Sequence, residues 1–281
     1  MSQPLTHGAI LRRYKLAIGG TFALLILENV IQVMQPLFLG FAIDGLIAQS
    51  YRELWTFVAL AMTGLSIGVA RRLYDTRAYG RIYRETASET VENENAKSTP
   101  VSKVTARANF VSEFAEFFEL YLPMALSSVA SLIGAVVMLF FISPLLGACA
   151  FGVGGVVGLV FFISRNAIST MNTSLNNEME RQVEVLEERN PVSAGLHFSS
   201  IVRWRIRLSD LEARNFGIAF GLTIVLAALA VFILIVREQA SEGTVFAALT
   251  YILQFSEAAI ILPYSYQQFI RTREISARLA S

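Results

Sequence analysis

Cysteine and histidine are scarce in this sequence of 281 residues. The single cysteine, Cys149, excludes a disulfide within the chain and lies in an apolar segment, where a packing role is expected. His7 and His197 are isolated, and no cluster of His, Cys and carboxylate residues has the spacing of metal ligands. We therefore expect no metal site and no catalytic constellation.

Motifs for nucleotide chemistry are also missing. The sequence has no G-x-x-x-x-G-K-[ST] segment, whose backbone and lysine would hold the phosphates of ATP. We expect that this chain is not an enzyme and carries no cofactor, so that any ATPase would be a separate subunit. The net charge of +1 gives no indication of a nucleic-acid partner.

Charge is sparse because long apolar runs fill the chain. Charged residues make up 16% of the sequence and hydrophobic residues 54%, with a mean hydropathy of +0.53. A helix needs about 20 apolar residues to cross the hydrocarbon of a bilayer. Six segments meet this requirement and predict an all-α membrane protein with six transmembrane helices in a single domain spanning 1–281: 16–39, 54–70, 122–142, 145–163, 216–236 and 245–270.

The basic residues predict how these helices are oriented. All of the 23 lysines and arginines except Arg52 and Arg237 lie near the termini or in the two long connections, 71–121 and 164–215. Lys and Arg are enriched on the cytoplasmic side of membrane proteins. We therefore expect both termini and both long connections in the cytoplasm, where the connections form helical extensions of the spans.

Polar residues interrupt the first apolar run. Glu28, Gln32 and Gln35 fall within about 60° of arc on a helix with 100° per residue, and Asn29 lies at the edge of this stripe. Glu28 has similar lengths of apolar sequence on either side, which predicts a position near mid-membrane. A charge at the bilayer centre costs about 2.5–3.5 kcal/mol, so this stripe is expected to face protein or a wet cavity.

The sixth run carries a matching stripe. Gln254, Glu257 and Tyr264 share one helix face, and Tyr251 lies nearby. We expect both stripes to line one cavity, with Glu28 close to Glu257. No Lys or Arg lies within a span to pair with either carboxylate. Arg71 and Arg72, at the end of the second span, are the closest candidates by depth.

Three roles for these polar residues remain open. They can form a proton-coupling site, they can bind a cationic or amphipathic substrate together with the neighbouring aromatic rings, or they can join helices through hydrogen bonds. The sequence does not choose among them.

A family resemblance emerges from several segments. The segment "QPLFLGFAIDGLI" resembles the end of the first helix of ABC exporter membrane domains, and "VTARANFVSEFAEFFELYLP" resembles the entry to the third. The segment "EGTVFAALTYILQFSEAAIILPYSYQQFIRTREISARLAS" is similar to the sixth helix. The resemblance covers residues 12–280. It implies a homodimer that encloses a central cavity and exchanges its fourth and fifth helices between protomers. We expect this protein in the bacterial inner membrane.

The resemblance also bears on the energy source. In the family, cytoplasmic coupling elements insert apolar anchors into an ATPase, yet the first such region here, "SETVENENAKSTPVSKV", has no aromatic residue. The second region contains Phe198 and Trp204, the candidate contacts to an ATPase subunit, although packing on neighbouring helices is an alternative. Some proton-driven bacterial peptide importers are similar, with this membrane fold and no nucleotide-binding domain.

We therefore expect a transporter that moves a small amphipathic or cationic solute or a peptide by alternating access. Either an ion gradient or a separately encoded ATPase would energise it. The alternative is a membrane scaffold or regulatory subunit that retains the fold without transporting anything.

Overall fold

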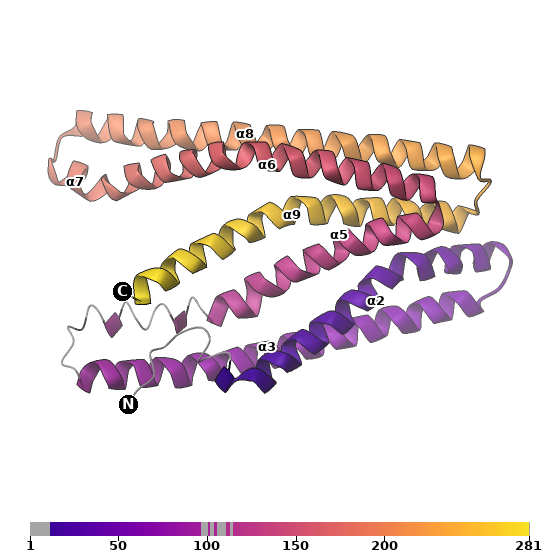
Figure 1. Ribbon diagram of the computed structural model, residues 1–281, viewed down its shortest axis with the longest axis horizontal. Helices are drawn as coiled ribbons and strands as arrows, with labels where there is room; N and C mark the ends of the chain where they lie inside the picture. Colours follow the sequence, from indigo (N-terminus) through magenta and orange to yellow (C-terminus); the bar gives the residue numbers. More distant parts are fainter. Residues whose placement is uncertain (1–11, 97–100, 102–103, 106–110, 113–114, 281) are drawn as a thin grey trace. The chain divides into compact units, whose positions relative to one another are not determined.

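The computed structural model describes residues 12–96, 101, 104–105, 111–112 and 115–280, and their side chains except Glu94 and 263–280. Within these residues the regular secondary structure is helical throughout (Figure 1). Six helices are long and apolar enough to cross a membrane, which confirms the predicted all-α membrane fold. The chain divides into two compact units, one formed by 1–147 and 230–281 and the other by 148–229.

The first unit begins with a helical hairpin. Helices α2 (Lys15–Ile47) and α3 (Arg52–Ala96) pack along each other and are joined by a short turn. Gln49 adopts the left-handed conformation with φ 59° in this turn, and the amide of Ser50 donates to the carbonyl of Gly45 at 2.7 Å. The Ser50 hydroxyl donates to Glu53 at 2.5 Å, an arrangement that ties the start of α3 to the turn.

The third span is introduced by a π-helical turn. Segment η1 (Phe117–Tyr121) runs directly into α5 (Leu122–Ile142), and Phe117 and Phe118 pack with Ile18, Tyr79 and Ile82 in one buried cluster. At its other end, α5 stops at Ser143, whose backbone is extended before Pro144 begins the next helix. Ser143 and Pro144 thus separate α5 from the next helix, at the point where the third and fourth predicted spans meet.

The last helix completes the first unit. Helix α9 (Glu242–Ala280) packs against α2 and α5, and it follows the π-helical segment η2 (Ile233–Arg237). Asp44 near the end of α2 caps α9: its Oδ1 accepts from the amide of Gly243 at 2.8 Å, and its Oδ2 accepts from the Ser241 hydroxyl at 2.6 Å. The free amides of a helix N-terminus favour such a carboxylate.

The second unit is a long hairpin. Helix α6 (Pro144–Glu180) and the short α7 (Gln182–Glu187) are followed by α8 (Pro191–Phe232), and the unit contains residues 148–229 of these elements (Figure 1). Two polar contacts join α6 to α8. The Ser164 hydroxyl donates to Asn215 at 3.1 Å, and Nδ1 of His197 lies 2.8 Å from a carboxylate oxygen of Glu178.

The helices extend well beyond the predicted apolar spans. Helix α2 continues from Leu39 to Ile47, and α3 continues from Ala70 to Ala96. Hydropathy marks only the apolar part of a helix, whereas intrahelical hydrogen bonds continue through polar sequence. The long helical extensions expected after the second and fourth spans and before the fifth span are therefore present as continuations of α3, α6 and α8.

Candidate ion-pair site between α2 and α3

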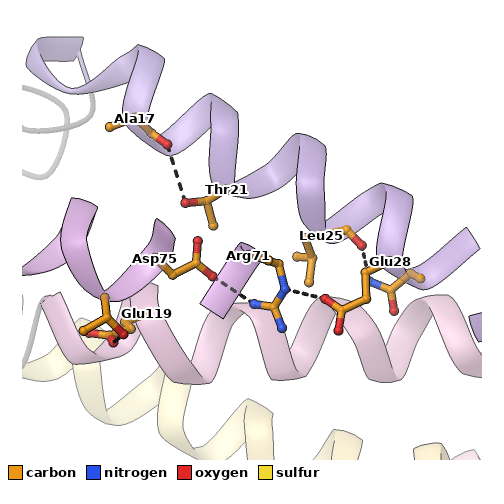
Figure 2. A network of polar contacts seen from close by, with 9 residues as sticks. Ala17, Thr21, Leu25, Glu28, Arg71, Asp75 and Glu119 are labelled. Atoms are coloured by element: carbon orange, nitrogen blue, oxygen red, sulfur yellow. Dashed lines mark hydrogen bonds and ion pairs between the residues drawn. The ribbon is translucent and has the colours of Figure 1, made fainter. Parts of the chain in front are cut away.

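The polar stripe of the first span faces the second helix of the hairpin. Glu28 on α2 is half-buried, and its Oε2 accepts a hydrogen bond from Nε of Arg71 on α3. Arg71 also donates through Nη1 to Oδ2 of Asp75 at 2.9 Å, one turn further along α3. Figure 2 shows the Arg71 guanidinium lying between these two carboxylates. Among the cations suggested by depth, the structure therefore identifies Arg71 as the partner of Glu28.

The register of the hairpin also locates the pair along the helices. Glu28 lies 19 residues before Ile47, the last residue of α2, and Arg71 lies 19 residues after Arg52, the first residue of α3. Arg71 directly follows the second apolar run. Glu28 and Arg71 therefore occupy matching positions along the hairpin. The mid-membrane position of Glu28 stays a prediction.

Two glycines of α3 make room for the polar stripe. A Cβ added at Gly68 would lie 2.8 Å from Oε1 of Glu28, and one at Gly64 would lie 3.2 Å from Nε2 of Gln35. The Gly64-x-x-x-Gly68 spacing thus allows the close helix approach that small residues provide in membranes. Here Glu28 fills the space at Gly68, and Ile31 and Gln35 fill the space at Gly64.

The remaining polar residues of α2 have different environments. Asn29 is buried, and its Nδ2 donates to the carbonyl of Leu25 at 2.8 Å, which is a contact within its own helix. Gln35 is half-buried beside Gly64, whereas Gln32 is exposed. The stripe is therefore divided between an α3-facing part and an exposed part, and Gln32 is its most accessible member.

The predicted site residues on α9 also have different environments. Tyr251 is fully buried, and its hydroxyl donates to the carbonyl of Val33 on α2 at 2.8 Å, so in this conformation it joins two helices. Gln254 is half-buried and Glu257 is exposed. The side chain of Tyr264 lies outside the described residues. The expected proximity of Glu257 to Glu28 stays a prediction.

Sequence reasoning missed Asp75 and Glu119. Asp75 lies outside the apolar runs, in a connection rich in charges. In the structure its side chain is only 2% exposed. Glu119 lies in η1 and accepts a hydrogen bond from the Thr76 hydroxyl at 2.7 Å. The spacing of Arg71 and Asp75, four residues apart on a helix, is the signal that could have indicated their pairing.

The candidate ATPase contacts lie on α8 in the second unit. Phe198 is exposed, whereas Trp204 is half-buried and has the guanidinium of Arg207 over its ring at 5.2 Å. Val183 and Leu186 of α7, at the tip of the hairpin, are exposed apolar residues that the sequence reasoning did not single out. Across the described residues, no group of three or more His, Cys, Asp or Glu side chains could hold a metal ion.

Six apolar helices and an ion pair between two of them define a polytopic α-helical membrane protein. Comparison with protein families matches residues 7–243 to the ABC transporter transmembrane region. The chain belongs to this family, which confirms the resemblance seen in the sequence. A search of curated proteins finds no match.

Proposed function

We propose that this chain is the membrane domain of a transporter that moves a small amphipathic or cationic solute or a peptide by alternating access. The family supports a transporter-type membrane domain. The observation that carries the proposal further is the shared ion-pair site, in which Arg71 contacts both Glu28 and Asp75. Two carboxylates and one guanidinium carry a net charge of −1, which favours a cation over an anion.

The site also suits a conformational change. Its contacts join α2 to α3 through side chains, and a side-chain ion pair can break and form again without unfolding either helix. Alternating access requires such contacts to differ between states, because a solute shifts an equilibrium only through different interactions with the two states. Glu28 and Arg71 are the pair that we expect to rearrange, with Gln32 exposed one turn further along α2.

Either an ion gradient or a separate ATPase subunit would supply the energy. The exposed apolar side chains Val183 and Leu186 at the hairpin tip, together with Phe198, support docking of a partner, since apolar anchors dominate interface energies. The sequence contains no ATP-binding motif. We therefore propose that this chain binds no cofactor and does not hydrolyse ATP.

The proposed assembly is a homodimer in the bacterial inner membrane, with both termini in the cytoplasm. Residues 148–229 form a compact unit of their own. An exchange of the α6–α8 hairpin between protomers is part of this proposal, and the family to which the chain belongs supports it. The distribution of lysine and arginine supports the orientation.

Flux measurements on proteoliposomes test the transporter. Vesicles with the wild-type chain, the Glu28→Gln variant or the Asp210→Asn control are loaded with buffer and offered a fluorescent lipophilic cation under an imposed pH difference. A second arm supplies ATP with any ATPase subunit that copurifies. Asp210 is exposed on α8, far along the chain from the ion pair. We expect flux above protein-free vesicles that falls at least about tenfold in Glu28→Gln, equivalent to about 1.4 kcal/mol, and is unchanged in Asp210→Asn.

Two outcomes contradict the proposal. Dye flux equal to that of protein-free vesicles in both arms favours the scaffold or regulatory alternative. Flux that responds to a driving force but is unchanged in Glu28→Gln retains the transporter and removes Glu28 from its substrate or ion pathway.

A further inference from the structure

The inference concerns Asp75 and rests on the proposed function, because it identifies the ion that the transporter would couple to. Two carboxylates share the single guanidinium of Arg71. Glu28 engages Nε and remains partly accessible, with its side chain 16% exposed. Asp75 engages Nη1 and has a side chain that is 2% exposed. The more deeply buried carboxylate thus has only part of a counter-charge.

Asp75 also has an oxygen without a partner. Its Oδ1 is buried and makes no hydrogen bond to any described residue. Burying an unpaired polar atom is unfavourable, and burying an unpaired charge is more so. This oxygen therefore points to a missing positive charge or hydrogen-bond donor.

The charged and titratable groups around Asp75 come from each element packed on this part of α3. Helix α2 contributes Glu28, and η1 contributes Glu119, which lies within electrostatic range of Tyr79. Helix α3 itself contributes Arg71, Tyr74 and Tyr79. Three of these groups, counting Asp75, are carboxylic acids and one is a cation. Within the part of the chain that the structure describes, these groups therefore supply one positive charge for three carboxylic acids.

We propose that Asp75 is a proton-binding site and that its protonation transfers Arg71 to Glu28. A proton adds to a lone pair of the Asp75 carboxylate and gives the neutral acid, with no other bond made or broken. Arg71 stays charged and then has Glu28 as its one anionic partner. A proton needs a single lone pair, whereas a metal ion needs several oxygen ligands, and the described residues hold no cluster that would supply them.

Proton binding at this position is linked to the contact between α2 and α3. When Asp75 is ionised, it competes with Glu28 for Arg71 and weakens the link between the helices. When Asp75 is protonated, Arg71 contacts Glu28 without this competition and the link is strengthened. A proton gradient then biases the opening of the helix pair, which is the coupling that an ion-driven transporter requires.

Infrared difference spectroscopy of the full chain in lipid nanodiscs tests this directly, without substrate or flux. Spectra between about pH 8 and about pH 5 report the carbonyl stretch of any carboxyl group that takes up a proton. Exposed acids absorb together, whereas a poorly hydrated carboxylic acid absorbs at a higher frequency. We expect such a high-frequency band in the wild type, its complete loss in Asp75→Asn, and its retention at a shifted position in Glu28→Gln. Asp210→Asn, an exposed position on α8, serves as control and should keep the band.

The opposite results overturn the proposal. These are a wild type without such a band, a band that persists in Asp75→Asn, a band lost only in Glu28→Gln, or a band that responds to added NaCl at constant pH. Labelling of the wild type with a hydrophobic carbodiimide requires no variant, and mass spectrometry should locate an Asp75 adduct that increases as the pH falls. Proton uptake by Asp75 without dye flux would refute the proposed function alone; flux without proton uptake would refute this inference alone.

Discussion

Gly68 of α3 lies directly against the carboxylate of Glu28 on α2, so that a Cβ at position 68 would be 2.8 Å from Oε1. The absence of a side chain at this position therefore allows Glu28 to reach Arg71. Glycine is unfavourable in a helix relative to alanine by about 1 kcal/mol. This cost is offset where a neighbouring group needs the space.

The first prediction compares two glycines of the same helix. Gly68→Ala should displace the Glu28 carboxylate and destabilise the protein by about 1–3 kcal/mol, the usual cost of overpacking. Gly80→Ala on α3 has no atom within 4 Å of the added Cβ and should be neutral or stabilising, since alanine favours a helix. Thermal unfolding of both variants in the same detergent measures the difference. Equal effects of the two substitutions would show that Glu28 does not occupy this space.

A double-mutant cycle tests the ion pair itself. Arg71→Gln should destabilise the protein by about 3 kcal/mol, because it leaves two poorly solvated carboxylates without their counter-charge. Glu28→Gln should cost less, because Arg71 keeps Asp75 as a partner. The double variant should cost less than the sum, which gives a coupling energy between the two side chains. The exposed pair Arg13 and Glu89 provides the control and should show no measurable coupling. Additive effects at positions 28 and 71 would contradict a direct interaction.

Some of this architecture follows from the sequence alone. Hydropathy located six spans, and the turn at Ser143-Pro144 is where the third and fourth apolar runs meet. Periodicity indicated that Glu28 faces protein or a wet cavity, because helical angles depend only on spacing along the chain. In the structure Glu28 contacts Arg71 of α3. The position of Arg71 and Arg72 at the end of the second span made them the candidate partners of Glu28. In the structure the partner is Arg71.

Other features depend on packing between segments that are distant in sequence. Tyr251 was assigned to a binding stripe from its helical angle, yet the approach of α2 buries it and presents the Val33 carbonyl to its hydroxyl. Asp75 was missed because burial of a carboxylate depends on which helix covers it. The π-helical segments η1 and η2 have no sequence signal that the apolar periodicity could reveal.

The contact between the ends of α2 and α9 gives a third prediction. A Cβ at Gly243 would overlap the carbonyl oxygen of Gly40, a backbone atom that cannot rotate away. Gly243→Ala should therefore cost about 3 kcal/mol or more. Asp44→Ala removes the cap of α9 and should cost about 1–2 kcal/mol. Gly19→Ala, with open space around the added Cβ, is the control. Unfolding curves that coincide for Gly243→Ala and Gly19→Ala would refute this close approach.

The last prediction concerns orientation in the membrane. Replacing Cys149 by serine gives a background without cysteine, since Cys149 is the one cysteine in the sequence. Single cysteines are then introduced at Ala48, exposed in the turn between α2 and α3, and at Glu187, exposed at the end of α7. A membrane-impermeant maleimide should label Ala48→Cys in intact cells and Glu187→Cys only after permeabilisation, because basic residues flank the second site and favour the cytoplasm. Labelling of Glu187→Cys in intact cells, with Ala48→Cys protected, would establish the reverse orientation. The tip of the α6–α8 hairpin would then lie outside the cell, where no cytoplasmic ATPase could reach it.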